Sequence, residues 1–170
     1  MEKAREAAGA GQYLTFDIGG HDLGVAVLRV REIIEYEAVT HVPSTPAWIR
    51  GVINLRGSVV PVVDLGVKFG LSESPVTGRS CIVMVDVELD GQQTTMGVVA
   101  DAVSQVIELG PDDLKAPPSF GSWVRVDFLR GMASVDGRFV LILDIDRVLS
   151  ARELLLASEA SASAGAGEAQ

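Results

Sequence analysis

The stretch Gly51-Val52-Ile53-Asn54-Leu55-Arg56-Gly57, followed by Val60-Pro61-Val62-Val63-Asp64-Leu65, decides the fold because its pattern returns later in the chain. A shift of 80 residues places Trp48-Ile49-Arg50-Gly51 on Phe128-Leu129-Arg130-Gly131, Gly57 on Gly137, and Val62-Val63-Asp64-Leu65 on Ile142-Leu143-Asp144-Ile145. Apolar, β-branched runs on either side of a glycine turn are typical of a β-hairpin. The chain therefore repeats one small β unit.

A second set of matches, at a shift of 73 residues, extends the repeat toward the N-terminus. Gly24-Val25 falls on Gly97-Val98, Val30 on Val103, and Ile33-Ile34-Glu35 on Val106-Ile107-Glu108. The change of shift indicates a loop insertion in the second copy, at about 115–123. We expect copies over about 13–70 and 81–149, and we expect them to pack on each other because a unit of this size is marginally stable alone.

The rest of the pattern is also mostly β. Strands are predicted where β-branched residues gather or apolar and polar residues alternate: 13–18, 23–30, 58–63, 81–88, 96–99 and 138–143. Two short helices are expected, one over Thr45–Gly51, with Thr45 as cap and Gly51 as stop, and one after Asp64. A longer C-terminal helix is expected over about 146–157.

Both ends of the chain are rich in Ala, Gly, Ser and Glu. Residues 1–12 and 158–170 carry too little apolar bulk to offset the entropy of ordering, so we expect disordered tails, the second of them acidic. Residues 13–157 are left as one domain.

Composition excludes several classes of function. The 14 Lys and Arg against 23 Asp and Glu give a net charge of −9, so nucleic acid is not an expected partner. One cysteine, Cys81, and two histidines are too few for a disulfide or a zinc site. The apolar runs are far shorter than the ~20 residues of a membrane-spanning helix. No secretory signal is evident, so we expect a cytoplasmic protein without membrane insertion.

The repeat separates residues that serve the fold from residues that differ between copies. Glycine at 51/131 and 57/137 and aspartate at 64/144 occur in both copies, as does the apolar pattern, which indicates structural roles. Gly57 and Gly137 suit a hairpin turn with positive φ. Arg56, by contrast, corresponds to Asp136 in the second copy, and Asp-Gly is a more favourable turn pair than Arg-Gly. Arg56 is either a solvated loop residue or a binding residue.

Glu32 differs in the same way, because its counterpart is Gln105. It is either an ordinary exposed strand residue or part of a binding surface. Paired carboxylates, Asp112-Asp113 and Asp144 with Asp146, are explained by a capped turn and a helix start. Cys81 lies inside an apolar strand and is expected to be an inert core thiol. Neither a Gly-x-Ser-x-Gly elbow nor a phosphate-binding loop is present, so no catalytic, metal or cofactor residues are predicted.

The quoted stretch resembles the CheW family of chemotaxis coupling proteins. The resemblance rests on Asn54-Leu55-Arg56-Gly57 with Pro61-Val62-Val63-Asp64-Leu65, and covers about 12–156. Further pieces match in order: Phe16 to Gly24, Val30-Arg31-Glu32-Ile33, Pro43 with Pro46, Asp101-Ala102-Val103 and Pro117-Pro118. An Asn-Leu-Arg-Gly turn followed by Pro-x-x-Asp-Leu is a specific signal.

The resemblance implies a mainly β fold of two intertwined five-stranded SH3-like β-barrels, with short helices. It implies an adaptor without catalytic activity that binds the regulatory domain of the histidine kinase CheA and the cytoplasmic tip of chemoreceptors, in arrays at the membrane. The implied receptor-binding residues are Val30, Glu32, Ile33, Asn54, Arg56 and Gly57, with an ion pair between Glu32 and Arg56. Structural roles fall to Gly51, Gly57, Pro61, Asp64, Gly131, Gly137 and Asp144.

Alternatives stay open at this point. The chain is otherwise a CheW-like adaptor of a non-flagellar chemosensory pathway or, from a different class, a β-barrel enzyme or small-molecule sensor. Binding of kinase and receptor fragments without substrate or metal distinguishes the adaptor from the enzyme and the sensor.

Overall fold

A computed structural model describes residues 11–116 and 124–150. The elements follow one another as β1 (Gly11–Ile18), β2 (His21–Ala26), η1 (Val27–Arg29), β3 (Val30–Glu35), β4 (Ile49–Leu55), β5 (Ser58–Val63), α2 (Leu65–Lys68), β6 (Cys81–Leu89), β7 (Gln92–Ala100), β8 (Ala102–Leu109), η2 (Val126–Phe128), β9 (Leu129–Val135), β10 (Arg138–Leu143) and α3 (Ile145–Val148). The fold is mainly β, as expected.

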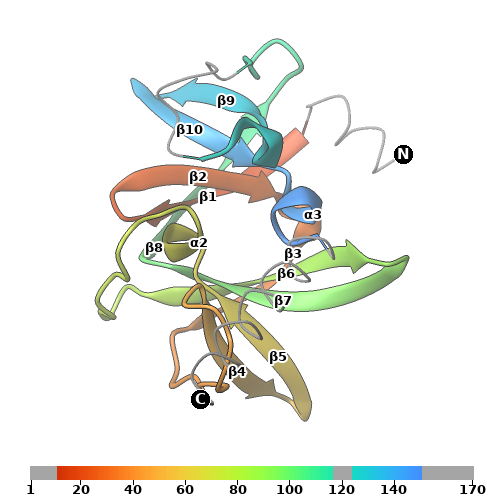
Figure 1. The fold of residues 1–170 in the computed structure, drawn as a ribbon. Helices are drawn as coiled ribbons and strands as arrows, with labels where there is room; N and C mark the ends of the chain where they lie inside the picture. The colour runs from red at the N-terminus through yellow and green to blue at the C-terminus, as the bar shows by residue number, and fades with distance from the viewer. Residues whose placement is uncertain (1–10, 117–123, 151–170) are drawn as a thin grey trace.

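The strands form two five-stranded sheets that exchange strands between the copies of the repeat. One sheet has the order β8-β1-β2-β10-β9 and the other β3-β6-β7-β5-β4, and the two lie one above the other in Figure 1. Each sheet combines the first two strands of one copy with the last three strands of the other copy. Strands of different copies pair in parallel as β2–β10 and β5–β7 and antiparallel as β1–β8 and β3–β6, while the pairs within a copy are all antiparallel. The expectation of two intertwined five-stranded units is confirmed.

Strand β6 shows why the sequence is so apolar. Its residues Ile82, Val83, Met84 and Val85 are all fully buried. Ile82 and Met84 pack in a cluster with β4 and β5, while Val83 and Val85 pack in a larger cluster shared by both sheets. A strand that is buried on both faces needs an unbroken apolar run instead of an alternating one. The apolar surplus therefore fills a core in each sheet and the seam between them.

Glycine is required at the start of β4 and of β9. Gly51 has φ +144°, and a Cβ there would lie 2.1 Å from the backbone oxygen of Thr40. At the equivalent Gly131, with φ +158°, a Cβ would lie 2.9 Å from the backbone oxygen of Lys115. In both copies a neighbouring segment forms a bridge beside the glycine, Thr40 to Val52 and Lys115 to Met132. The missing Cβ at these two positions thus lets the Thr40 segment approach β4 and the Lys115 segment approach β9.

The prediction of a short helix over Thr45–Gly51 is wrong. The hydroxyl of Thr45 donates to the backbone oxygen of Val42 at 2.8 Å and caps nothing, and a single turn joins Pro46 to Ile49 at 3.0 Å. From Ile49 onward the backbone pairs with β5, so Gly51 lies inside a strand and does not end a helix. Non-local strand pairing overrides the local helix signal.

The helix after Asp64 forms as α2. Asp64 accepts a hydrogen bond from the backbone nitrogen of Val67 at 3.1 Å, which caps the helix, and Gly70, with φ +99°, follows its end. Asp144 caps α3 in the same way, through the nitrogen of Arg147 at 3.3 Å. Conservation of the aspartate within the repeat therefore has a direct local cause.

The longer C-terminal helix is wrong within the described residues. Helix α3 begins at Ile145, one residue earlier than expected, and ends after one turn at Val148, with Leu149 as its C-cap. Ile145, Val148 and Leu149 are buried in the seam cluster. Residues 151–157 of the expected helix lie outside the described residues. None of the helices that are described is long and apolar enough to span a membrane.

The N-terminal boundary also differs slightly from expectation. Gly11 and Gln12, assigned to the tail, extend β1 and pair with Leu109 and Glu108 of β8. The remainder of that tail (1–10), the acidic tail (158–170) and most of the loop insertion (117–123) lie outside the described residues.

Pro61 lies at a point of β5 where its missing N–H is not needed. The parallel pairing between β5 and β7 begins only at Val62, whereas the equivalent pairing of β10 with β2 already includes Leu141, the counterpart of Pro61. A proline is tolerated where no ladder hydrogen bond is donated.

Candidate functional site

Strand β3 carries three of the predicted receptor-binding residues, and a bulge decides where each one faces. Between Val30 and Glu32 the register with β6 shifts by one residue, so that Val30 pairs with Val85, Glu32 with Met84 and Ile33 with Val83. Ladder partners share a face of the sheet. Val30 and Ile33 therefore face the side of the seam cluster, while Glu32 faces the opposite side, toward the end of the β4–β5 hairpin.

The turn between β4 and β5 presents Arg56 at its tip. Arg56 has φ +50° and Gly57 has φ +87°, a pair of left-handed residues that gives the tight turn favoured in hairpins. The side chain of Asn54 accepts a hydrogen bond from the nitrogen of Gly57 at 2.8 Å and fixes this turn. Left-handed backbone is unfavourable for arginine, so local conformation does not account for the residue at position 56.

Arg56 and Glu32 form an ion pair, as expected, and the pair connects the two edge strands of one sheet. Besides a closer contact between the Arg56 Nη2 and Glu32 Oε1 atoms, Arg56 Nη1 lies 3.4 Å from Glu32 Oε2. The hydrogen bond from Arg56 lowers the pKa of Glu32, and the same bond raises the pKa of Arg56. Arg56 remains largely exposed, so its free donor groups are available to a partner carboxylate.

Apolar side chains lie on β3, on the face opposite to Glu32, and on β5 next to the turn. Ile33 is 44% exposed and Val59, next to the turn on β5, is 71% exposed. Val30 is partly buried and packs against the seam cluster. The residues Val30, Glu32, Ile33, Asn54, Arg56 and Gly57, called the first-copy surface below, thus combine apolar side chains on one face of β3 with an ion pair on the other.

The second copy repeats this backbone with different chemistry. The turn between β9 and β10 places Asp136 at φ +52° and Gly137 at φ +80°. Gln105 and Val106 of β8 take the positions of Glu32 and Ile33, and Phe139, the counterpart of Val59, is 65% exposed. The equivalent surface has lost the arginine and the ion pair and has gained an acid and a larger apolar group.

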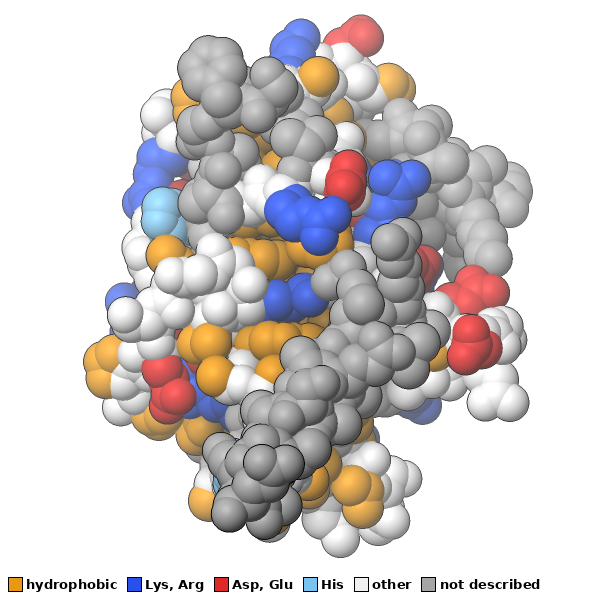
Figure 2. All heavy atoms as spheres, in the orientation of Figure 1, with side chains coloured by type: hydrophobic (Ala, Val, Ile, Leu, Met, Phe, Trp, Pro, Cys, Tyr) orange, Lys and Arg blue, Asp and Glu red, His pale blue; other side chains and the backbone are white. Residues whose placement is uncertain are grey.

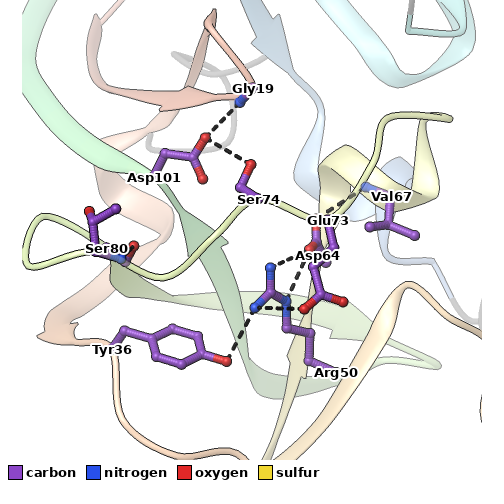
Figure 3. A network of polar contacts seen from close by, with 10 residues as sticks. Gly19, Tyr36, Arg50, Asp64, Val67, Glu73, Ser74, Ser80 and Asp101 are labelled. Carbon is purple, nitrogen blue, oxygen red and sulfur yellow. Dashed lines mark hydrogen bonds and ion pairs between the residues drawn. The ribbon is translucent and has the colours of Figure 1, made fainter.

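Sequence reasoning missed a buried network at the open end of the β4–β5 hairpin, opposite to the turn that carries Arg56, drawn in Figure 3. Arg50 donates to the same Asp64 oxygen from Nε at 3.0 Å and from Nη2 at 2.7 Å, and to the hydroxyl of Tyr36 at 3.2 Å. Glu73 lies 3.7 Å from Arg50 Nη1. Both side chains of the Arg50–Asp64 pair are only 7% exposed.

The network ties the segment after β3 to β4 and α2. Burial acts to lower the pKa of Arg50, but hydrogen bonds from Arg50 to Asp64 and Tyr36 outweigh it and the pKa is raised. A signal existed in the sequence, because the repeat keeps both the arginine (50 and 130) and the aspartate (64 and 144). In the same view Asp101 accepts hydrogen bonds from the nitrogen of Gly19 at 2.8 Å and the hydroxyl of Ser74 at 3.0 Å.

A cation also bridges the two copies of the repeat. Lys68 of α2 lies 4.5 Å from the ring centroid of Trp48 and 5.3 Å from that of Phe128. Trp48 belongs to the first copy and Phe128 is its counterpart in the second. A charge held between these equivalent rings stabilises the joint between the copies.

The thiol of Cys81 and the metal-binding residue types show no sign of a catalytic or metal site in the described residues. Cys81 is buried, and burial raises the pKa of its thiol although a hydrogen bond involving the backbone of Val103 opposes this. Within the described ranges no cluster of three or more His, Cys, Asp or Glu is arranged to hold a metal ion.

Comparison with known proteins agrees with this arrangement. The model of the CheW-like domain family matches residues 12–153. The chain is 34% identical over 145 residues to the chemotaxis protein CheW of Klebsiella aerogenes, covering 85% of each chain. It is 30% identical over 145 residues to the chemotaxis protein CheW of Rhizobium meliloti, covering 85% of this chain and 91% of that one.

The chain belongs to the CheW family.

A solved structure confirms the fold of this CheW protein. The crystal structure of the scaffolding protein TtCheW from Thermoanaerobacter tengcongensis matches with a TM-score of 0.71 at 29% identity, covering 80% of this chain and 85% of that one. CheW proteins are chemotaxis scaffolds and not enzymes, so the enzyme alternative raised by the sequence is set aside. As a chemotaxis scaffold, the protein acts by binding signalling partners.

Proposed function

We propose that this CheW protein works in the cytoplasm and couples chemoreceptors to the histidine kinase CheA, with the first-copy surface as the receptor contact. The observation that carries the proposal is the Glu32–Arg56 pair, which joins β3 to the β4–β5 turn in the first copy and is replaced by Gln105 and Asp136 in the second. The backbone keeps the same left-handed turn in both copies. A difference in side chains on an unchanged backbone supports a binding role for those side chains.

A receptor tip of helices fits this surface by its chemistry. Helices dock through apolar anchors, and charged groups at the rim fix their register. Val30 and Ile33 supply the apolar anchors on one face of β3, while Arg56 offers a bidentate donor to a carboxylate on the helix. Glu32 holds the guanidinium in place, so its role is positioning and not direct attraction of the receptor.

The kinase contact is assigned to the equivalent surface of the second copy. A hollow of about 680 Å³ lies there between β8 and the β9–β10 hairpin, with Gln105, Asp136 and the exposed Phe139 among its lining residues. A large exposed aromatic group is a frequent anchor of protein interfaces. Two unlike surfaces on one scaffold allow the receptor and the kinase to bind at the same time.

The test is chemical-shift mapping of the full chain, titrated separately with a receptor tip fragment and with the regulatory domain of CheA. The receptor fragment is expected to shift amides of β3 and the β4–β5 turn, and the kinase domain those of β8 and the β9–β10 hairpin. Phe139→Ser is expected to weaken kinase binding and to leave receptor binding unchanged. Receptor-induced shifts confined to the second copy would overturn the assignment, as would kinase binding that ignores Phe139.

A further inference from the structure

A pocket of about 330 Å³ lies where Ala26 and Arg29 of the first copy meet β9, α3 and the end of β10 in the second copy, and most of its lining residues are charged. Three arginines, Arg29, Arg130 and Arg147, and two carboxylates, Asp144 and Asp146, line it, so the lining carries a net charge of +1 in a protein of net charge −9. Figure 2 shows basic side chains gathered across the middle of the face that carries α3. An excess of guanidinium groups in a hollow attracts anions.

Both carboxylates of the pocket already have partners. Asp146 forms an ion pair with Arg29 through both of its oxygens, at 2.9 Å for Oδ1 and closer for Oδ2, and Oδ1 also accepts the backbone nitrogen of Glu88 at 3.0 Å. Asp144 accepts the backbone nitrogen of Arg147 at 3.3 Å and lies 3.6 Å from its Nε atom. Neither acid is therefore left to neutralise a further arginine.

Arg130 is the arginine of this pocket that neither carboxylate engages. It is half-buried in the pocket, and among the residues that the structure describes no hydrogen bond or ion pair engages its guanidinium. Its counterpart Arg50 is fully engaged by Asp64 and Tyr36. The difference has a cause in the sequence: Arg147 stands where the first copy has Val67 and engages Asp144, and Leu109 stands where the first copy has Tyr36.

We propose that this pocket binds a doubly charged oxyanion, a phosphate group either free or carried by a small molecule. Arg130 is its principal ligand, because a planar guanidinium donates two parallel hydrogen bonds to such an anion. Arg147, which is exposed at the rim of the pocket, is the second ligand. The acids keep Arg29 and Arg147 in position and limit the net charge, so a single anion is expected.

The test is a titration of the full-length, ¹⁵N-labelled chain with inorganic phosphate, with sodium chloride and sodium acetate at equal ionic strength as controls. Saturable shifts are expected at the backbone amides of 129–131 and 144–147 and at the Arg130 side chain. Arg130→Gln is expected to raise the Kd for phosphate at least about tenfold, whereas Arg130→Lys keeps part of the affinity.

The matched control is Arg138→Gln, which removes an exposed arginine of the same copy whose Nε atom lies 2.9 Å from Asp22. It is expected to leave phosphate binding unchanged, and all variants are checked for an unchanged unfolding midpoint. Shifts that chloride or acetate reproduces, or phosphate affinity that persists in a folded Arg130→Gln variant, would overturn the proposal. A phosphorylated metabolite that binds more tightly than free phosphate identifies the source of the group.

Discussion

The tips of the β4–β5 and β9–β10 hairpins have nearly the same backbone and opposite charge. Arg56 and Asp136 have φ values of +50° and +52°, and each is followed by a glycine in the left-handed region. Aspartate tolerates this conformation better than arginine does. The first hairpin therefore keeps an unfavourable residue at its tip, next to Glu32, while the second has the residue that suits the turn. The comparison indicates that the fold sets the backbone of both hairpins, and it supports the proposed binding role of Arg56.

The same contrast holds in the interior. In the first copy Arg50 and Asp64 form a buried pair, whereas in the second Asp144 pairs with Arg147 and Arg130 faces a pocket. Arg50 thus forms a buried ion pair that joins neighbouring segments of the first copy, whereas Arg130 lines an accessible pocket. Duplicated units can thus divide structural and binding roles between equivalent positions.

The largest effect is expected from alanine at the glycines that precede the edge-strand bridges. Gly51→Ala should lower the free energy of unfolding by about 4 kcal/mol, from backbone strain together with displacement of the Thr40 segment. Gly131→Ala, with a Cβ contact of 2.9 Å instead of 2.1 Å, should cost about 3 kcal/mol. Urea unfolding of both variants measures the difference. A greater loss from Gly131→Ala would contradict the described asymmetry.

The buried pair is the next comparison. Asp64→Asn leaves the buried Arg50 with only the exposed carboxylate of Glu73 as a charged partner and should destabilise the fold by about 3 kcal/mol, because removing one partner of a buried pair is costly. Asp144→Asn removes a carboxylate whose partner Arg147 is largely exposed, so its cost should stay below about 1 kcal/mol. Asparagine can still cap a helix in both variants. Thermal and urea unfolding check the values, and equal losses would show that the pair does not close the first copy.

A smaller effect is expected at the exposed pair. The pKa of Glu32 lies below its ordinary value of 4.5 because Arg56 binds its charged form. A carboxylate with a lowered folded-state pKa stabilises the fold at neutral pH, and this contribution is lost as the pH falls through that pKa. In Arg56→Gln the pKa of Glu32 should return toward 4.5, as followed by carboxyl chemical shifts against pH. An unchanged Glu32 titration in that variant would mean that the ion pair is absent in solution.

Much of the fold could be predicted because the repeat is visible in the sequence. Matching Gly57 with Gly137 and Asp64 with Asp144 predicts the hairpin turns and the caps of α2 and α3, which depend on local backbone chemistry. The helix expected at Thr45 failed because β4 pairs with β5, and short-range signals do not contain that pairing. The exchange of strands between sheets is equally non-local, and it entered the expectations only through the family resemblance.

The candidate site was predictable in part. The differences Arg56/Asp136 and Glu32/Gln105 mark its charged residues, and the ion pair between Glu32 and Arg56 followed from the resemblance. The bulge at Arg31, which turns Val30 and Ile33 to one face and Glu32 to the other, left no signal in the sequence. The replacement of Val67 by Arg147 is visible in the sequence, but its consequence for Arg130 depends on packing around Asp144.

The most direct measurement is the affinity of a receptor tip fragment for Arg56→Asp and, as the matched control, for Asp136→Arg, determined by isothermal titration calorimetry. Both changes exchange the tip residues of equivalent turns, so both variants should fold. Arg56→Asp is predicted to weaken receptor binding at least about tenfold, because a bidentate donor is replaced by a like charge facing the receptor carboxylate. Asp136→Arg is predicted to bind as the natural chain does. Unchanged binding by folded Arg56→Asp, or an equal loss in Asp136→Arg, would contradict the assignment of receptor recognition to the first copy.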